Sequence, residues 1–459
     1  MTAPFPEVRS TVPGVAWPGL PDRQGAAMLG LQYQLALSEW LSAEELERRA
    51  FEQLGALLDH CMAQAPFWAE RLAHAGYAVG TRMDRAAWSR VPVIRRREIQ
   101  QAGTSLLSRA DPPGHGARLP FFTSGSTGSP VEGVHTQFTK LFWDAITIRD
   151  QLWHRRNPVD RIAFIRRVKG LEAGPHGATS PAWSQSLGAA FVNGPSQLFE
   201  LDRPVSEQVT WLAKIDPHYI HTQPSLVREI IAETERRGIR LRNLKAVSTF
   251  GEIVDDSVRR LVAERWHVPI QDLYSTVEAG FIALQCPSHE HYHVQSEVCM
   301  VEVLDGAGRP CRPGETGEIV VTPLHNFAMP LLRYAIGDFA EVGPPCPCGR
   351  GLPVLARITG RVRNVLRRPD GSVFRPRLDN LFDGVETPIV QYQVVEHAPA
   401  QLAIRLVAEQ PLPEADRATL IRNAAAMFGA MYDIAIVYAD AIARGAGGKF
   451  EDLMLLGDR

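Results

Sequence analysis

Cysteine is scarce in this sequence, which holds only six cysteines among 459 residues. Disulfide frameworks belong to small secreted domains that cannot build a large core, so this scarcity argues against a disulfide-stapled fold. The chain also lacks an apolar run of the roughly 18 residues that span a bilayer, and it begins without the basic-then-apolar pattern of a secretory signal. We therefore expect a cytoplasmic protein without a membrane partner.

An excess of charge of either sign is missing too. Lysine and arginine together number 49, and aspartate and glutamate 51, which gives a formal net charge of -2. A nucleic-acid-binding surface needs a basic excess, so we expect no nucleic-acid partner. The hydrophobic fraction of 45% is that of a globular protein. The length predicts two or three folded units, and the chain can be a monomer or a homodimer.

A loop rich in glycine and hydroxyl groups stands out between residues 121 and 136, whose sequence is FFTSGSTGSPVEGVHT. Glycines let backbone N–H groups approach an anion closely, and the hydroxyls add further donors. The apolar residues 119–122 predict a strand that carries the loop. The P-loop pattern of nucleotide hydrolases is not met, because no lysine follows Gly128. We predict a polyphosphate-binding loop, with a surface turn as the alternative, formed by Thr123, Ser124, Gly125, Ser126, Thr127 and Gly128.

Downstream of this loop, helix-like and strand-like segments alternate. A Ser42/Glu45 capping-box pattern predicts a helix over residues 42–65, before the loop. Further helices are predicted over residues 137–152, 205–214, 225–237 and 255–266, and strands over residues 161–165, 189–192, 218–221 and 244–250. Such alternation predicts a mostly parallel sheet covered by helices, and ligands bind at the carboxyl ends of the strands of such sheets.

Three predicted strand ends carry residues suited to a nucleotide. A glycine after a strand lets a flat ring or a phosphate approach the backbone, an aromatic side chain can stack on a base, and a carboxylate can hold Mg²⁺ or a ribose diol. The residues in question are Gly251 and Glu252, then Tyr274, Ser275, Thr276 and Glu278, and finally Asp338.

The order and spacing of these motifs resemble those of the adenylate-forming superfamily, and most closely its phenylacetate-CoA ligase-like subgroup. In this chain the motifs run from the glycine-rich loop through residues 250–252, 274–278, 334–338 and 358–364 to Gly448 and Lys449. The resemblance implies an α/β fold: a large N-terminal domain of mixed sheets covered by helices over residues 1–361, and a small mobile α+β C-terminal domain over residues 362–459. Strands over residues 389–395 and 402–407 and a helix over 414–428 suit the smaller domain.

The resemblance also assigns roles to single residues. The glycine-rich loop would hold the phosphates of ATP, Gly251 and Glu252 would line the adenine and acyl sites with residues 274–276, and Glu278 would ligate Mg²⁺. Tyr274 would pack on adenine, and Asp338 would accept hydrogen bonds from the ribose. Arg361 would reach the ribose or the phosphates, and Arg363 occupies the hinge position. Lys449 would neutralise the negative charge that develops between the carboxylate and the α-phosphate.

The implied reaction is the ATP-dependent activation of a carboxylic acid as acyl-AMP with release of pyrophosphate, followed by transfer to a thiol such as CoA. By analogy with the subgroup the acid is aromatic, in a pocket between residues 143–148, 222–225 and 250–251. Two alternatives stay open: an acceptor that is an amine or another small nitrogen nucleophile, and a catalytically faded nucleotide-binding relative. Ser129 in place of the usual lysine, and Val277 in place of a threonine or serine, keep the faded alternative open.

Cysteines and histidines gather in two segments with metal-like spacing. Three thiolates and one imidazole make a closed tetrahedral Zn²⁺ site of the structural type, which some members of the subgroup carry. The predicted ligands are Cys286, His289, Cys346 and Cys348. His291 competes for the imidazole place, and His293 is expected to face the nucleotide pocket.

Overall fold

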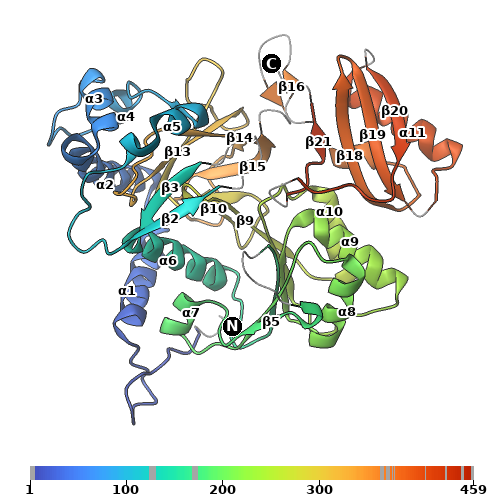
Figure 1. The fold of residues 1–459 in the computed structure, drawn as a ribbon, viewed down its shortest axis with the longest axis horizontal. Coiled ribbons are helices and arrows are strands. Elements are labelled where there is room, and N and C mark those ends of the chain that lie inside the picture. The colour runs from blue at the N-terminus through green and yellow to red at the C-terminus, as the bar shows by residue number, and fades with distance from the viewer. Residues whose placement is uncertain are drawn as a thin grey trace. The chain divides into compact units, whose positions relative to one another are not determined.

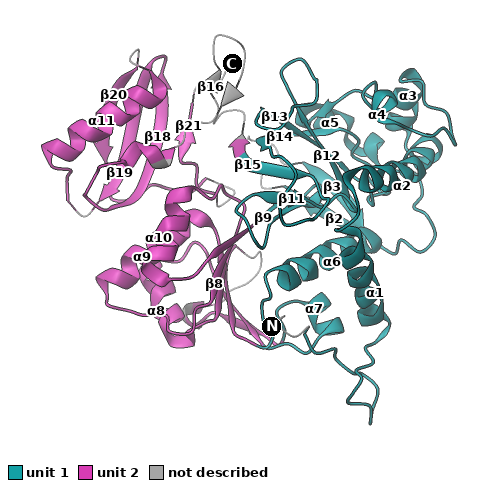
Figure 2. Cartoon of the chain, turned by 180° about the vertical axis from the view of Figure 1, so that it is seen from behind, with its two compact units in different colours: residues 1–159, 182–194, 273–358 teal, residues 160–181, 195–272, 359–459 magenta. Residues whose placement is uncertain are grey.

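The computed structural model describes residues 6–123, 131–167, 174–361, 366–367, 373–374, 376, 378–408, 410–429, 432–445 and 449–455. Its contacts divide the chain into two compact units (Figure 2). The first comprises Met1–Val159, Ala182–Gly194 and Leu273–Ile358, and the second comprises Asp160–Pro181, Pro195–Asp272 and Thr359–Arg459. The domain boundary predicted after residue 361 lies inside the second unit and stays a prediction.

Helices make up the N-terminal part of the first unit (Figure 1). They are α1 (Arg23–Ser38), α2 (Ala43–Gln64), α3 (Pro66–His74), α4 (Arg85–Trp88), α5 (Arg96–Ala102), α6 (Gln137–Trp153) and α7 (Gln185–Ala190). The predicted helix over residues 42–65 is confirmed as α2, because the side chain of Ser42 caps it by accepting from Glu45 N. No helix among the described residues is long and apolar enough to cross a membrane.

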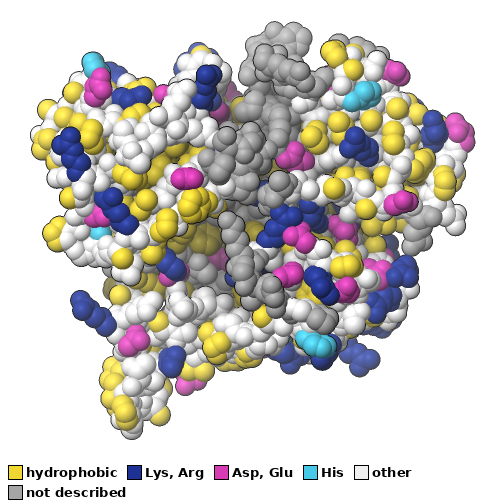
Figure 3. Space-filling model, in the orientation of Figure 1, with side chains coloured by type: hydrophobic (Ala, Val, Ile, Leu, Met, Phe, Trp, Pro, Cys, Tyr) yellow, Lys and Arg dark blue, Asp and Glu magenta, His cyan; other side chains and the backbone are white. Residues whose placement is uncertain are grey.

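The segment ahead of α1 exposes large apolar side chains. Val12 is 44%, Trp17 86% and Leu20 53% exposed. This segment projects at the lower left of Figure 1, and the same projection is largely yellow in the space-filling view of Figure 3.

The sheet of the first unit is mixed. Its strands follow the order β12, β13, β14, β15, β11, β10, β9, with β1 paired in parallel to β14. Their bounds are β1 (Ile94–Arg95), β9 (Ile270–Thr276), β10 (Gly280–Gln285), β11 (Tyr292–Val294), β12 (Cys299–Leu304), β13 (Thr316–Pro323), β14 (Tyr334–Val342) and β15 (Val354–Arg361). The boundary between the two units falls inside β9 and again inside β15.

A separate hairpin carries the glycine-rich loop. It consists of β2 (Arg118–Phe122) and β3 (Glu132–Thr136), which pair antiparallel. The neck of the loop is closed by two hydrogen bonds between Thr123 and Val131: Thr123 N donates to Val131 O at 2.9 Å, and Val131 N donates to Thr123 Oγ1 at 2.8 Å. Helix α6 follows the hairpin directly and lies beside it (Figure 1).

The second unit holds a largely parallel sheet in the order β8, β7, β4, β6, β5, in which only the β5–β6 pair is antiparallel. The strands are β4 (Ile162–Ile165), β5 (Ala178–Ser180), β6 (Ser196–Phe199), β7 (Tyr219–Thr222) and β8 (Ala246–Phe250), and the helices are α8 (Val205–Ile215), α9 (Pro224–Arg236) and α10 (Asp256–Trp266). The helices bury their apolar faces against these strands. The predicted alternation of strand and helix is therefore confirmed here.

The C-terminal part of the second unit forms a smaller α+β layer. Its sheet runs β20, β19, β18, β21, and α11 packs against one face of it (Figure 1). The elements are β18 (Ile389–Ala398), β19 (Gln401–Ala408), α11 (Glu414–Phe428), β20 (Asp433–Tyr438) and β21 (Leu453–Met454), preceded by the short pair β16 (Leu366–Arg367) and β17 (Val373–Phe374). The predicted α/β class with a small α+β part is confirmed.

One predicted strand is wrong in its first half. The sequence predicts an extended segment over residues 189–192, but α7, which begins after its N-cap Ser184, continues to Ala190. Phe191 is extended and forms an antiparallel bridge with Val8. The helix packs closely on α1, since a Cβ placed on Gly25 would lie 2.2 Å from Ala189 O. The close packing of α1 and α7 therefore requires small residues such as Gly25 and Ala189 at their contact.

Candidate functional site

Tyr274 and Asp338, the residues expected at adenine and ribose, meet in the first unit. They lie on β9 and β14, and the Tyr274 hydroxyl donates to Asp338 Oδ2 at 2.7 Å. Ser275 and Thr276 end β9 next to them. Thr276 Oγ1 accepts from Ala279 N at 3.0 Å and so shapes the turn that carries Glu278.

Glu278 is buried on that turn and lies close to a cation that was not predicted. Arg96 Nη1 is 3.6 Å from Glu278 Oε1, and Arg96 Nη2 donates to Thr123 Oγ1 at 3.0 Å. One guanidinium therefore joins the neck of the glycine-rich loop to the predicted Mg²⁺ ligand. The carboxylate oxygens of Glu278 are of the type that Mg²⁺ takes in proteins. Arg96 stands inside a run of three arginines, and nothing in the sequence distinguishes it from its neighbours.

A histidine holds the backbone next to Glu278. His135 on β3 donates from Nε2 to Val277 O at 3.0 Å, while Asn326 Nδ2 lies 3.1 Å from His135 Nδ1. Burial lowers the pKa of His135 to about 4, so the imidazole is neutral at pH 7. A neutral ring that accepts at Nδ1 and donates at Nε2 fixes the Val277 carbonyl beside the turn.

Lys449 lies at the carboxyl end of β8 in the second unit. The glycine that follows the strand, Gly251, has φ +80°, and a Cβ built on it would lie 3.7 Å from Lys449 Cε. Gly445 N donates to Lys449 O at 2.9 Å, which ties the backbone of the lysine to Gly445. The sequence therefore singled out two residues, Gly251 and Lys449, that the structure brings together.

Glu252, the next residue, is engaged by the protein itself. Its Oε2 accepts from Ser225 N at 3.1 Å, and its Oε1 accepts from Phe450 N at 2.5 Å and from Arg444 Nη1 at 3.2 Å. Burial raises the pKa of the Glu252 carboxyl, and the nearby Arg444 charge acts in the opposite direction. Arg444 and Phe450 were not anticipated, because no local pattern links residues that lie 192 and 198 positions from Glu252.

Some predicted residues lie outside the part of the chain that the structure describes. They are Ser124, Gly125, Ser126, Thr127 and Gly128 of the loop, Arg363 at the hinge, and the side chain of Arg361. Their roles stay predictions.

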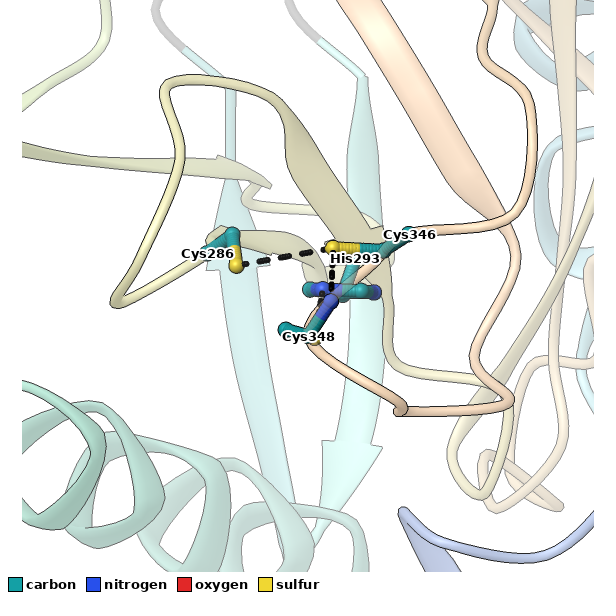
Figure 4. A group of neighbouring side chains, drawn as sticks. All are labelled: Cys286, His293, Cys346 and Cys348. Atoms are coloured by element: carbon teal, nitrogen blue, oxygen red, sulfur yellow. Dashed lines mark hydrogen bonds between the residues drawn. The ribbon is translucent and has the colours of Figure 1, made fainter.

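The predicted metal cluster forms in the first unit with one change of ligand. Figure 4 shows Cys286, His293, Cys346 and Cys348 pointing toward one another, and their ligand atoms all lie within 4.8 Å of one another. His289, the predicted imidazole, lies instead in the exposed turn that follows Cys286. The expectation that His293 faces the nucleotide pocket is corrected as well, because β11 buries its ring completely beside the thiols.

The geometry of this cluster fits a tetrahedral metal ion. Cys286 Sγ and Cys346 Sγ are 3.9 Å apart, close to the edge of about 3.8 Å that follows from metal–sulfur bonds of about 2.3 Å. His293 directs Nε2 toward Cys348 Sγ at 3.5 Å and Nδ1 toward Leu352 O at 3.4 Å, the outer contact that typically orients a ligating imidazole. His291, the competitor, contacts Cys346 Sγ at 2.9 Å from outside this group.

Comparisons with known proteins find relatives both by sequence and by fold. The model of the CapK C-terminal domain matches residues 366–454. A solved structure of 2-hydroxyisobutyryl-CoA ligase has a TM-score of 0.73 at 19% identity and covers 92% of this chain and 91% of that one. The phenylacetate-coenzyme A ligase of Thermus thermophilus is 24% identical over 372 residues, which are 80% of this chain and 81% of that protein. The chain therefore has the fold of the adenylate-forming CoA ligases and is related in sequence to the phenylacetate-coenzyme A ligases.

Two further relatives are more and less similar to the chain. The phenylacetate-coenzyme A ligase of Escherichia coli is 25% identical over 356 residues, which are 74% of this chain and 77% of that enzyme. The structure of an anthranilate CoA ligase shares the fold at a TM-score of 0.52 and 14% identity, over 72% of this chain and 65% of that one. The predicted relationship to the phenylacetate-CoA ligases is thus confirmed.

Proposed function

We propose that the protein activates an aromatic carboxylic acid as its acyl-adenylate and then transfers the acyl group to the thiol of CoA. The observation that carries the proposal is the approach of Lys449 to Gly251 at the carboxyl end of β8, where parallel sheets bind ligands. The relatives named phenylacetate-coenzyme A ligase support both the aromatic acid and CoA. Phe250, the last residue of β8, stacks on His221 with ring centroids 4.6 Å apart, which offers an apolar surface at that strand end.

The chemistry requires an activated acid because a carboxylate is a poor electrophile. A carboxylate oxygen attacks the α-phosphorus of ATP, the bond to the bridging oxygen of the β-phosphate breaks, and pyrophosphate leaves. Lys449 stabilises the charge on the α-phosphate, and the Tyr274–Asp338 pair binds the adenosine. Glu278 would hold Mg²⁺, which supplies charge neutralisation to the phosphates when bound. The thiolate then attacks the acyl carbon, and AMP leaves.

The test is pyrophosphate release from Mg-ATP across a panel of aromatic and aliphatic carboxylic acids, with and without CoA. We expect release that depends on an aromatic acid and is accelerated by CoA. Acid-dependent release that CoA does not accelerate, but that an amine does, would replace the thiol acceptor by a nitrogen nucleophile. Binding of ATP without release for any acid would favour the faded relative.

We also propose that Cys286, His293, Cys346 and Cys348 hold a structural zinc ion. The four ligands close the site, so zinc would contribute to folding by joining the end of β10 to the segment after β14.

Zinc removal should therefore lower stability. We expect about one zinc per chain in protein purified without added metal, and a fall in melting temperature of about 5 to 10 °C after treatment with a strong chelator. Cys346→Ser should lose the zinc, whereas Cys311→Ser, outside the cluster, should keep it. Zinc well below one per chain, with a melting temperature that the chelator does not change, would contradict the proposal.

A further inference from the structure

Residues on both sides of Lys449 in the chain are held by a single carboxylate. On one side Arg444 Nη1 donates to Glu252 Oε1 at 3.2 Å, and on the other Phe450 N donates to the same oxygen at 2.5 Å. The hydrogen bond from Gly445 N to Lys449 O lies between these two anchors. The position of the lysine is therefore tied to Glu252 through its chain neighbours on either side.

Arg444 also attaches this segment to the first turns of α9. Its guanidinium makes contacts of 2.7 to 3.2 Å with acceptors of four residues, which are Gln223, Ser225, Glu229 and Glu252. Ser225 contributes twice, because its hydroxyl accepts from Arg444 and its backbone N–H donates to Glu252 Oε2. A planar fork of five N–H donors can meet acceptors on two sides at once, whereas a lysine donates three hydrogen bonds from a single atom.

Burial makes these contacts depend on one another. The side chains of Arg444 and Glu229 are each 13% exposed, and that of Glu252 is 6% exposed. A charge with so little access to water is unfavourable without its partner. Loss of Arg444 would leave the carboxylates of Glu229 and Glu252 without their cation. We then expect Lys449 to move away from Gly251.

We propose that Glu252 and Arg444 are positioning residues that dock Lys449 against the end of β8, and that this docking serves adenylation and not thioester formation. The inference rests on the proposed function. It assigns to Glu252 a contact with the protein in place of the contact with the nucleotide expected from the sequence. The lysine belongs to the C-terminal part of the chain. The docking contacts therefore control whether its ammonium lies at the end of β8.

The kinetic test compares Arg444→Met with Arg422→Met, an exposed arginine on α11. Arg444→Met should lower the kcat of acid-dependent ATP–pyrophosphate exchange about 50-fold, with KM for ATP and acid within about threefold, because misplacement of a catalytic group acts on the reacting state. Transfer of the acyl group from supplied acyl-adenylate should stay within about threefold. Arg444→Lys should recover part of the exchange, and Arg422→Met should match the wild type in both assays.

A double-mutant cycle tests whether the two residues act together. Glu252→Gln keeps an acceptor for Phe450 N but removes the charge that Arg444 meets. If Glu252 and Arg444 act as a unit, Arg444→Met should lower the kcat of ATP–pyrophosphate exchange much less in the Glu252→Gln background than in the wild type. Full additivity of the two losses would overturn the proposal.

Hydrogen–deuterium exchange over residues 441–455 separates this inference from the proposed function, because it needs no turnover. We expect faster exchange of this segment in Arg444→Met than in the wild type or Arg422→Met, with unchanged exchange in α11. If the wild type shows no acid-dependent exchange of pyrophosphate, the proposed function fails while faster deuterium uptake still supports the docking. Unchanged uptake, or equal loss of adenylation and transfer, would overturn the docking role.

Discussion

Replacement of Lys449 by methionine is expected to slow acid-dependent ATP–pyrophosphate exchange by about a thousandfold, which corresponds to about 4 kcal/mol of lost transition-state stabilisation. Methionine keeps much of the length and apolar stem of the lysine but removes its charge. The lysine lies against Gly251. In the proposed mechanism its ammonium meets the charge that develops as the carboxylate attacks the α-phosphorus. Acyl transfer from supplied acyl-adenylate should change by less than about threefold, since pyrophosphate has already left.

The two half-reactions therefore have to be measured separately. Lys214→Met, at an exposed lysine on α8 of the same unit, is the matched control and should behave as the wild type in both assays. Equal loss of exchange and transfer in Lys449→Met would contradict a role confined to adenylation. Retention of full exchange would remove Lys449 from the mechanism altogether.

Local sequence patterns predicted several of the longer helices and strands because the forces that set their ends are local. The Ser42 cap and the apolar spacing after it defined α2, and the acidic first turn and apolar face of residues 414–428 matched α11. The order of motifs also brought out Tyr274 and Asp338, although 64 positions separate them along the chain. Such agreement is expected where a residue's role follows from the strand end on which it lies.

Roles that depend on distant partners could not be predicted in this way. The zinc imidazole shows the limit: spacing from Cys286 favoured His289, whereas the pairing of β11 with β10 and β15 selects His293. His291 precedes β11 and lies outside the group. Nothing local in the sequence marked the contacts of Glu252 either, because its partners come from α9 and from the C-terminal segment.

The second large effect is expected at Arg96. Its guanidinium donates to Thr123 Oγ1 at the neck of the glycine-rich loop and lies 3.6 Å from Glu278 Oε1. The sequence from residue 123 to residue 136 contains no lysine or arginine, although a triphosphate carries several negative charges. We expect Arg96→Met to raise the Kd for Mg-ATP more than about tenfold and to lower kcat/KM for pyrophosphate release about a hundredfold, because a charged hydrogen-bonding group contributes about 1.5 to 3 kcal/mol.

Arg97→Met provides the matched control, because Arg97 is the adjacent residue of α5 and its side chain is exposed. Calorimetric titration should give Arg97→Met the same Kd for Mg-ATP as the wild type.

Arg96 could instead have a purely structural role, in which it only ties Thr123 to the turn that carries Glu278. In that case Arg96→Met would lower the melting temperature, and Arg96→Gln would largely restore it because glutamine keeps hydrogen-bond donors without the charge. If the charge itself binds phosphate, Arg96→Gln should fail in ATP binding as Arg96→Met does, while Arg96→Lys recovers part of the affinity. Unchanged ATP affinity in Arg96→Met would contradict the phosphate contact, and the cation for the glycine-rich loop would then have to come from elsewhere in the chain.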